Sequence, residues 1–361
     1  MIIQSNPRRT QLKRFVQTTL QIAAFSLVCA APASAQLAGP GPNDAIYMYR
    51  GADRQQVLVE KAKKEGMLMW YTSMAPTESR PLAAAFEKKY GIKVELWRGP
   101  NEALIQRIMT EAKSRRHTFD VVETNGTETE VFSREHILSR TYTPYEADFP
   151  PSAVPAHHMW MPTRFNFLVT AFNTTKVKRE DIPKTYEGFI DPKWKGLVSI
   201  EAGDWDWMAA IQKKYGTAKA NAFFTQFAAM KPDLRKGHPL IANLVGAGEV
   251  PVSLTTFLSN VISVQRKGSP IDWVPVEPVL AIPFGIGVAK QAPHPHAAML
   301  FMDYVLSPEG QDMLESLGRL PASTKIKQTI VNFPFVPLDV VSSLDESEKR
   351  QKQWDDYFLK R

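Results

Sequence analysis

Cysteine is almost absent from this sequence, because Cys29 is the only one among 361 residues. It lies inside an N-terminal stretch that we interpret below as a removable signal, and residues 36–361 contain none. A chain without cysteine cannot form disulfides, use a thiolate nucleophile or bind a metal through sulfur. These roles are therefore excluded for residues 36–361.

Long apolar runs are missing as well. The apolar stretch at residues 20–31 is shorter than the about 20 residues of a transmembrane helix, and no later stretch approaches that length. Four basic residues precede this stretch, and Ala33-Ser34-Ala35 follows it as an A-x-A cleavage site. We therefore predict a signal peptide at residues 1–35, cleaved after Ala35, and a periplasmic protein that does not span the membrane. The export route, Sec or twin-arginine, stays open because Gln11 replaces the usual large apolar residue.

A strong excess of one charge sign is also lacking. The chain has 44 Lys and Arg against 37 Asp and Glu, but residues 1–35 carry four of the basic residues and no acidic ones. The remaining chain therefore has a formal charge of +3. Its basic residues are spread beside acidic ones, so we predict no nucleic-acid partner.

Motifs of catalysis and metal binding are not found. The sequence has no Gly-rich phosphate loop, no nucleophile elbow and no H-E-x-x-H helix. The histidines include His157-His158 and His294-Pro295-His296, and neither pair has the spacing of a zinc site. We predict no enzyme activity, no cofactor and no metal, and we keep an enzyme acting on a small molecule as the less favoured alternative.

Helices and strands alternate along the first part of the chain. The expected elements are a helix at 53–65, a strand at 67–71, a helix at 76–90, a strand at 92–97, a helix at 102–114 and a strand at 119–122. Such alternation predicts a parallel sheet in an α/β fold, where ligands bind beyond the carboxyl ends of the strands.

A long apolar segment at residues 165–173 has the length to connect two lobes, and we interpret it as the first hinge crossing. A second α/β block follows, with strands at 197–200 and 250–254, helices at 205–215, 218–230, 240–247 and 256–267, and return strands near 273–276 and 285–289. Helices at 296–306, 308–317 and 346–359 complete the chain. We predict a two-lobed fold, with lobe 1 at 44–163 and 278–361 and lobe 2, including the hinge crossings, at 164–277.

Several strings of residues occur in a recognisable order. They are KKEG at 63–66 followed by WYTS at 70–73, AFEKKYGIKV at 85–94, DPKWKG at 191–196, GEV at 248–250 and LSPEGQ at 306–311. Together they resemble the ferric-iron-type periplasmic solute-binding proteins of ABC importers, over roughly residues 55–325. The resemblance implies a type II periplasmic-binding fold, in which two α/β lobes close over a solute and deliver it to a membrane permease.

One part of the family pattern is missing. Ferric-binding relatives place two adjacent tyrosines just after the strand that corresponds to residues 250–254, because phenolate oxygens suit Fe(III). Here residues 254–260 read LTTFLSN, and Leu258 and Ser259 stand at the tyrosine positions. We therefore do not expect a tyrosinate iron site, although ferric iron or an iron chelate stays the first alternative for the ligand.

Polar residues that follow the expected strands are candidates for binding the solute. Ser73 and Met74 follow the first strand, where a hydroxyl and free N–H groups would hold an oxyanion. Asn125, Gly126 and Thr127 take the same position after the third strand, and glycine permits close backbone approach. The alternative for both groups is an ordinary helix cap.

Arg164 and Asn166 open the expected crossing strand, where the resemblance implies a basic residue facing the cleft. A guanidinium there would bind a carboxylate or phosphonate through paired hydrogen bonds, and the alternative is a surface ion pair. Thr255, Thr256 and Phe257 are candidates by position in the family, with a helix cap as the alternative for Thr255.

Two acids and two indoles, Asp204, Trp205, Asp206 and Trp207, begin a helix after the strand that ends near Glu201. Carboxylates beside aromatic faces suit a cationic or aromatic solute. The alternative is that one Asp caps the helix while the tryptophans pack inside. Glu277, near the return crossing, either joins a polar network or is solvated.

The sequence thus predicts the periplasmic substrate-binding component of an ABC importer. The expected partners are a small organic solute, anionic or zwitterionic, and an inner-membrane ABC permease, and the protein is expected to act as a monomer. Arg164 favours an anion and the acids near residue 204 favour a cation, so a zwitterion would satisfy both. A receptor that signals to a membrane sensor remains an open alternative.

Overall fold

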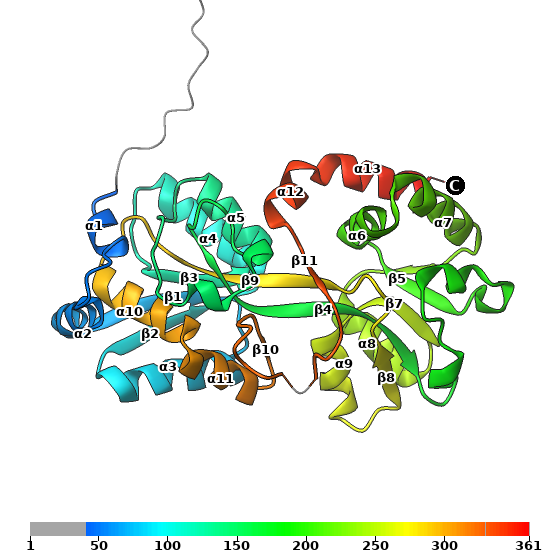
Figure 1. Ribbon diagram of the computed structural model, residues 1–361, viewed down its shortest axis with the longest axis horizontal. Helices are drawn as coiled ribbons and strands as arrows, with labels where there is room; N and C mark the ends of the chain where they lie inside the picture. The colour runs from blue at the N-terminus through cyan, green and yellow to red at the C-terminus, as the bar shows by residue number, and fades with distance from the viewer. Residues whose placement is uncertain (1–40, 329, 361) are drawn as a thin grey trace, which may run out of the picture. The chain divides into compact units, whose positions relative to one another are not determined.

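The helices and strands follow the predicted order (Figure 1), and the computed structural model describes them over residues 41–328 and 330–360. The predicted signal peptide and its cleavage site lie outside the described residues. The α-helices are α1 (Asp44–Tyr47), α2 (Arg54–Glu65), α3 (Pro76–Tyr90), α4 (Asn101–Lys113), α5 (Gly126–Arg134), α6 (Trp205–Tyr215), α7 (Thr217–Ala229), α8 (His238–Ala247), α9 (Leu258–Gln265), α10 (Pro295–Leu306), α11 (Pro308–Ser316), α12 (Val340–Asp345) and α13 (Ser347–Phe358). The strands are β1 (Met67–Thr72), β2 (Lys93–Arg98), β3 (Val121–Asn125), β4 (Met161–Asn173), β5 (Val198–Glu201), β6 (Asp233–Arg235), β7 (Val252–Phe257), β8 (Ile271–Val274), β9 (Leu280–Val288), β10 (Leu320–Pro321) and β11 (Val336–Pro337).

Strands β1, β2 and β3 form the parallel unit that the alternating pattern predicts. β1 pairs in parallel with both neighbours, with Met67 opposite Lys93 and Trp70 opposite Val121. Trp70 and Phe86, the latter on α3, are fully buried and pack against Phe301 of α10. Because parallel strands end at the same edge, the loops after β1 and β3 open on one side of the sheet.

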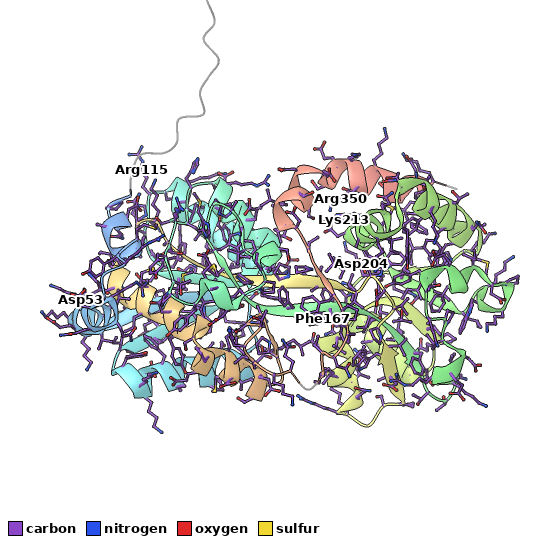
Figure 2. The ribbon with its side chains drawn as sticks, in the orientation of Figure 1. Asp53, Arg115, Phe167, Asp204, Lys213 and Arg350 are labelled. Atoms are coloured by element: carbon purple, nitrogen blue, oxygen red, sulfur yellow. The ribbon has the colours of Figure 1, made fainter. Side chains whose placement is uncertain are left out.

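Two long strands, β4 and β9, join the parts of the sheet. β9 pairs antiparallel with β3 and β4. β4 pairs with β9 over residues 161–167 and with β7 and β8 over residues 168–173. Every residue of β4 is buried, and Phe167 is labelled where this strand passes between the two groups of helices (Figure 2). The crossing predicted at 165–173 therefore begins four residues earlier.

The sheet is mixed, whereas the alternation of elements predicts a parallel one. The reason lies in the connections, because β4 and β9 are the crossing strands and pair antiparallel with the strands beside them, without an intervening βαβ crossover. The strand order β2-β1-β3-β9-β4-β7-β5-β6 combines these two arrangements and confirms the predicted α/β class.

Strands β7, β5 and β6 form a second parallel unit, flanked by α6 to α9. Val198 of β5 lies opposite Val252 of β7, and Ser199 lies opposite Asp233 of β6. β7 continues to Phe257, beyond the predicted end at residue 254, because it pairs with Leu168 and Val169 of β4. The predicted helix at 256–267 accordingly begins later, as α9.

The C-terminal segment returns across both parts of the sheet. β10 pairs with β4, β11 pairs with β9, and α12 contacts α5. The apolar face of α13 covers α6 and α7, where the Trp354 ring lies 6.5 Å from Trp207 and Phe358 lies 6.2 Å from Phe227. The helix predicted at 346–359 thus packs on helices of the predicted second lobe, while the lobe boundaries remain a prediction.

Several short elements, among them α1, β6, β10, β11 and α12, have no counterpart among the predicted ones, because segments of two to six residues carry too little periodicity. Within the parts of the chain that the structure describes, no helix has both the length and the apolar character to cross a bilayer.

Candidate functional site

A polar cavity of about 200 Å³ opens beyond the carboxyl end of β1. Four of the predicted binding residues line it together, namely Ser73, Met74, Arg164 and Asn166. The remaining walls come from α3, β2, α9, β9 and the segment before β10, and their polar side chains are Glu78, Arg98, Ser259 and Arg319. The fold therefore gathers residues that are up to 247 positions apart in the chain, from Ser73 to Leu320.

Arg164 is the most buried of the basic residues around this cavity. It is 5% exposed, its Nη1 donates to the carboxylate of Glu123 on β3, and its guanidinium carbon lies 4.0 Å from the Phe284 ring centre. Thr72 Oγ1 also donates to Glu123, over 2.8 Å. The other guanidinium nitrogens of Arg164 make no hydrogen bond within the described residues, which leaves them available to a ligand.

Two further arginines add positive charge to the cavity wall. Arg319 is paired with Glu78, and Arg98, at the end of β2, is exposed and has no ion-pair partner among residues 41–328 and 330–360. Because Glu123 and Glu78 offset two of the three guanidinium groups, one positive charge remains uncompensated. Such a wall attracts anions.

The helix-cap alternative fails for Ser73. Residue Ala75, not Ser73, precedes α3, and it makes no side-chain capping bond. The Ser73 hydroxyl instead lies 3.0 Å from Thr124 Oγ1, which donates to Asn101 Oδ1 over 3.2 Å. Ser73 therefore joins a hydroxyl network at the edge of the sheet.

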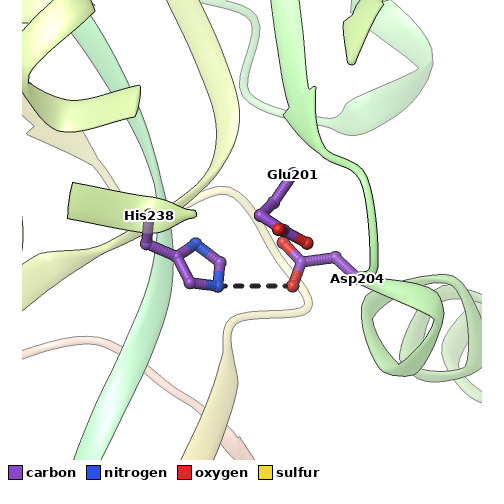
Figure 3. Close-up of side chains that lie close together, drawn as sticks. All are labelled: Glu201, Asp204 and His238. Atoms are coloured by element: carbon purple, nitrogen blue, oxygen red, sulfur yellow. Dashed lines mark ion pairs between the residues drawn. The ribbon is translucent and has the colours of Figure 1, made fainter. Parts of the chain in front are cut away.

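A second group of polar side chains lies where β5 and β7 end. Glu201 ends β5, Asp204 precedes α6, and His238 is the first residue of α8 (Figure 3). His238 Nε2 is 3.5 Å from Asp204 Oδ1, and one potential ligand atom from each residue lies within 4.8 Å of the others. We call these three residues the Glu-Asp-His cluster.

The surrounding backbone fixes the orientation of the cluster. Gly237 has φ of 100°, a conformation that favours glycine, and its N–H donates to Glu201 Oε1 over 3.0 Å. Thr255 Oγ1 accepts from the N–H of Glu201, and the Thr255 carbonyl lies 3.2 Å from His238 Nδ1. The ring of Phe257 stacks on His238 with 3.7 Å between centres.

Burial controls the charges in this cluster. Burial, and then the charge of Glu201, raise the pKa of Asp204 well above its usual value. Burial lowers the pKa of the His238 imidazole, against the attraction of Glu201. Both effects disfavour charged forms at a place where several acceptor atoms meet.

The rest of the string at 204–207 has structural partners. Trp207 is fully buried and packs edge-on against Tyr186, 5.1 Å away, which agrees with the packing alternative. Asp206 accepts from Ser343 Oγ at 2.8 Å and from Arg350 at 2.6 Å, and so it anchors the C-terminal segment to α6. Trp205 is half-buried and packs against the core.

The other predicted residues neither line the cavity nor belong to the Glu-Asp-His cluster. Glu277 forms an exposed 3.0 Å ion pair with Lys214, in keeping with the solvated alternative. Asn125 precedes α5 without capping it through its side chain, and a Cβ on Gly126 would lie 3.0 Å from the Pro283 carbonyl. Thr127 is half-buried, and Thr256 is buried with a hydroxyl that has no hydrogen-bond partner among the described residues.

Sequence reasoning missed three residues of these sites. Arg98 and Arg319 look like ordinary surface charges in the sequence, although Arg98 directly follows the strand predicted at 92–97, which was an available signal. The spacing of His238 to the other histidines gives no sign of a site. The carboxylate partners of His238 lie 34 and 37 residues away in the chain, and so only the pairing of β5 with β7, on which α8 packs, brings them together.

Comparison with known proteins places these observations in context. Residues 81–332 match the family model described as bacterial extracellular solute-binding protein. Iron uptake protein A1 of Synechocystis sp. is 24% identical over 270 residues, which cover 68% of this chain and 72% of that protein. The Fe(3+)-binding periplasmic protein of Serratia marcescens is 21% identical over 244 residues, covering 64% and 71%.

Solved structures confirm the two-lobed α/β fold class. Iron-bound HitA from Pseudomonas aeruginosa has a TM-score of 0.67 and 20% identity, covering 80% of this chain and 99% of that one. The periplasmic binding protein AfuA from Actinobacillus pleuropneumoniae, with bound fructose-6-phosphate, has a TM-score of 0.65 and 22% identity, covering 82% and 100%.

Proposed function

Because the chain belongs to the family of bacterial extracellular solute-binding proteins, we propose that it is the periplasmic substrate-binding component of an ABC importer, specific for a small organic solute with an anionic group. The observation that carries the anionic part is the cavity that Arg98, Arg164 and Arg319 line with one uncompensated positive charge. Among the solved relatives, AfuA with fructose-6-phosphate is a precedent for an organic anion in this fold.

The cavity offers a complete set of contacts for a carboxylate or phosphate group. Arg98 and the unpaired nitrogens of Arg164 supply charge-assisted donors, whereas the single proton of the Ser73 hydroxyl is directed at Thr124 Oγ1. Arg164 is held in place by Glu123, so little side-chain freedom is lost when an anion binds to it. A zwitterionic solute stays within the proposal, although Glu201 and Asp204 do not line this cavity.

Ferric iron is the alternative that the names of several relatives suggest. Ser259, which lines the cavity, stands with Leu258 where the resemblance implies two tyrosines. Among the described residues that line the cavity, Glu78 alone carries a carboxylate, and it is already paired with Arg319. Fe(III) needs hard anionic donors, so this donor set favours an organic anion over the bare ion.

Several parts of the proposal concern the protein's surroundings. We propose that residues 1–35 are a signal peptide cleaved after Ala35, that the mature protein works in the periplasm as a monomer, and that it delivers its solute to an inner-membrane permease. The proposed lobes, 44–163 with 278–361 and 164–277, would close on the solute by bending at β4 and β9. The protein would release its ligand chemically unchanged and would have no enzymatic role.

Thermal unfolding with a panel of ligands tests the proposal. The panel contains small carboxylates, phosphonates, sugar phosphates, amino acids, polyamines and chelated ferric iron. A ligand at about 100 times its Kd stabilises the protein by about 2.7 kcal/mol, which gives a measurable rise in Tm. We expect a rise with one class of organic anion, and a rise with ferric iron alone would refute the organic-anion proposal.

Matched arginine variants locate the site. Arg98→Gln should weaken binding of the identified anion about 10- to 100-fold, because a hydrogen bond to a charged group is worth about 1.5–3 kcal/mol. Arg115→Gln is the control, since Arg115 is exposed beyond the end of α4 and does not line the cavity. Equal affinity of both variants would show that the anion binds elsewhere. Mass spectrometry of the recovered ligand would reveal any turnover.

A further inference from the structure

The Glu-Asp-His cluster has more hydrogen-bond acceptors than donors. A carbonyl oxygen only accepts, so the 3.2 Å contact with the Thr255 carbonyl requires that His238 Nδ1 carry the ring proton. In the neutral ring Nε2 is then a bare lone pair. It faces Asp204 Oδ1, another acceptor, at 3.5 Å. With Asp204 ionised, as a metal-binding carboxylate must be, no proton lies between these two atoms.

The two carboxylates of the cluster also have acceptor lone pairs that no donor fills. Asp204 Oδ2 is buried and has no hydrogen-bond partner in the described part of the chain. The two oxygens of Glu201 each accept one backbone N–H, from Gly203 and Gly237, and each keeps a free lone pair. Asp204 Oδ2 is thus a buried acceptor without a partner, and with the lone pairs of His238 Nε2 and Glu201 close to it the cluster calls for an added positive centre.

We propose that Glu201, Asp204 and His238 bind a first-row divalent transition-metal cation, with Zn²⁺ as the reference ion. In tetrahedral coordination, with bonds of about 2.0–2.1 Å, neighbouring ligand atoms lie about 3.3 Å apart. The observed 3.5 Å between His238 Nε2 and Asp204 Oδ1 is close to that edge. Three protein ligands would leave a coordination position open to water or another small ligand.

The 3.5 Å between His238 Nε2 and Asp204 Oδ1 fits a metal ion better than an organic ammonium group. Acceptors that surround an ammonium nitrogen at about 2.8 Å in tetrahedral directions lie about 4.6 Å apart, well beyond the observed separation. Ca²⁺ is also disfavoured, because it takes six to eight oxygen ligands and no imidazole. One imidazole with two carboxylates is a donor set that binds Zn²⁺ and other first-row divalent transition metals.

The hydrogen bond at the second ring nitrogen of His238 is of the kind found at histidine ligands of metal ions. Metal-ligating histidines commonly donate their second ring N–H to a backbone carbonyl, which fixes the tautomer and aims the other nitrogen at the ion. Thr255 supplies that carbonyl, and Phe257 holds the ring plane by stacking. The side chains of His238 and Asp204 are 14% and 12% exposed, so an ion can reach them from solvent.

Direct metal binding tests this inference with the ion alone, and so the result does not depend on the proposed solute. The purified protein is stripped with a chelator, checked for folding by circular dichroism, and titrated calorimetrically with Zn²⁺. We expect one equivalent per chain, and Co²⁺ in the same site should give the visible absorption of a tetrahedral centre. A folded protein that takes up no Zn²⁺ would overturn the proposal.

Matched variants assign the bound ion to the cluster. Asp204→Asn and His238→Gln should each weaken Zn²⁺ binding by at least about 100-fold, since even outer-shell changes cost 10- to 100-fold. Asp206→Asn is the control, because Asp206 is two residues away and is paired with Arg350. Unchanged affinity in Asp204→Asn or His238→Gln would place the ion elsewhere and refute the assignment.

The thermal stability of the metal-free variants shows whether a loss of Zn²⁺ binding comes from the missing ligand or from unfolding. Asp204→Asn removes a buried carboxylate beside Glu201 and brings an N–H that can donate to His238 Nε2, so the metal-free variant should melt at or above the Tm of the native protein. Zn²⁺ should raise the Tm of the native protein and of Asp206→Asn, and leave that of Asp204→Asn unchanged. An equal Zn²⁺-induced rise in all three would contradict the proposal.

Discussion

Replacing Glu128 by glutamine measures the cost of ionising a buried carboxyl near the edge of the sheet. Glu128 lies in the first turn of α5, and its Oε2 is buried without a hydrogen-bond partner within the described residues. Burial, together with the charge of Glu102 in the first turn of α4, raises the pKa of Glu128 from 4.5 to about 7. Glutamine keeps the shape and removes the charge.

The sign and size of the effect follow from proton linkage. Below pH 4.5 the carboxyl is protonated in the folded and unfolded states, and it has no effect on stability. As pH rises from 4.5 to about 7, the unfolded state loses the proton first, so native stability falls. Each pH unit is worth about 1.4 kcal/mol, and the interval corresponds to about 3 kcal/mol. The shift to about 7 already includes the opposing hydrogen bond from the α5 backbone, so the expected difference is about 2–3 kcal/mol.

Urea unfolding followed by tryptophan fluorescence gives the test. We expect Glu128→Gln to match the native protein at pH 4 and to exceed its free energy of unfolding by about 2–3 kcal/mol at pH 8. Glu135→Gln, at the exposed end of the same helix, is the control and should show no such pH dependence. A difference for Glu128→Gln that is the same at both pH values would refute the reasoning from burial.

Three further substitutions probe the packing. Trp354→Ala should lower the free energy of unfolding by about 3–5 kcal/mol, measured by urea, because it removes a fully buried indole between α13 and α6, and a loss below 1 kcal/mol would show that α13 contributes little. Gly310→Ala should destabilise the protein by more than about 3 kcal/mol, since a Cβ would lie 2.1 Å from the Tyr304 carbonyl, and a native Tm would contradict this. Arg54→Met should cost about 3–5 kcal/mol by leaving Asp303 buried without its charged partner, and adding Asp303→Leu should restore most of the loss in the same urea assay.

Local sequence signals were sufficient for most elements of the fold. The helix at 205–215 was predicted with its observed bounds, and α3 with bounds set by Pro76 and by Gly91 after Tyr90. These signals work because capping residues and apolar periodicity act within a few residues of one another. The resemblance to ferric-iron-type binding proteins, carried by short strings, is confirmed by the family model and by solved structures.

The candidate site was only partly predictable. Ser73, Met74, Arg164 and Asn166 were expected from their positions near strand ends, and they do share one cavity. Asp206, in contrast, was predicted as a ligand contact and is bound to Arg350 of α13. The sequence shows that α13 has an apolar face, but it does not show which surface that face covers.

The amino-acid sequence by itself determined the α/β class, the order of the elements and the family, because each depends on local patterns or short motifs. Tertiary structure alone decided which charges are compensated and which meet. Arg164 faces Glu123, Arg98 keeps no partner among the described residues, and His238 reaches Glu201 and Asp204 across the ends of β5 and β7. Such pairings depend on the register of strands and the packing of helices far apart in the chain, and no local pattern encodes those distances.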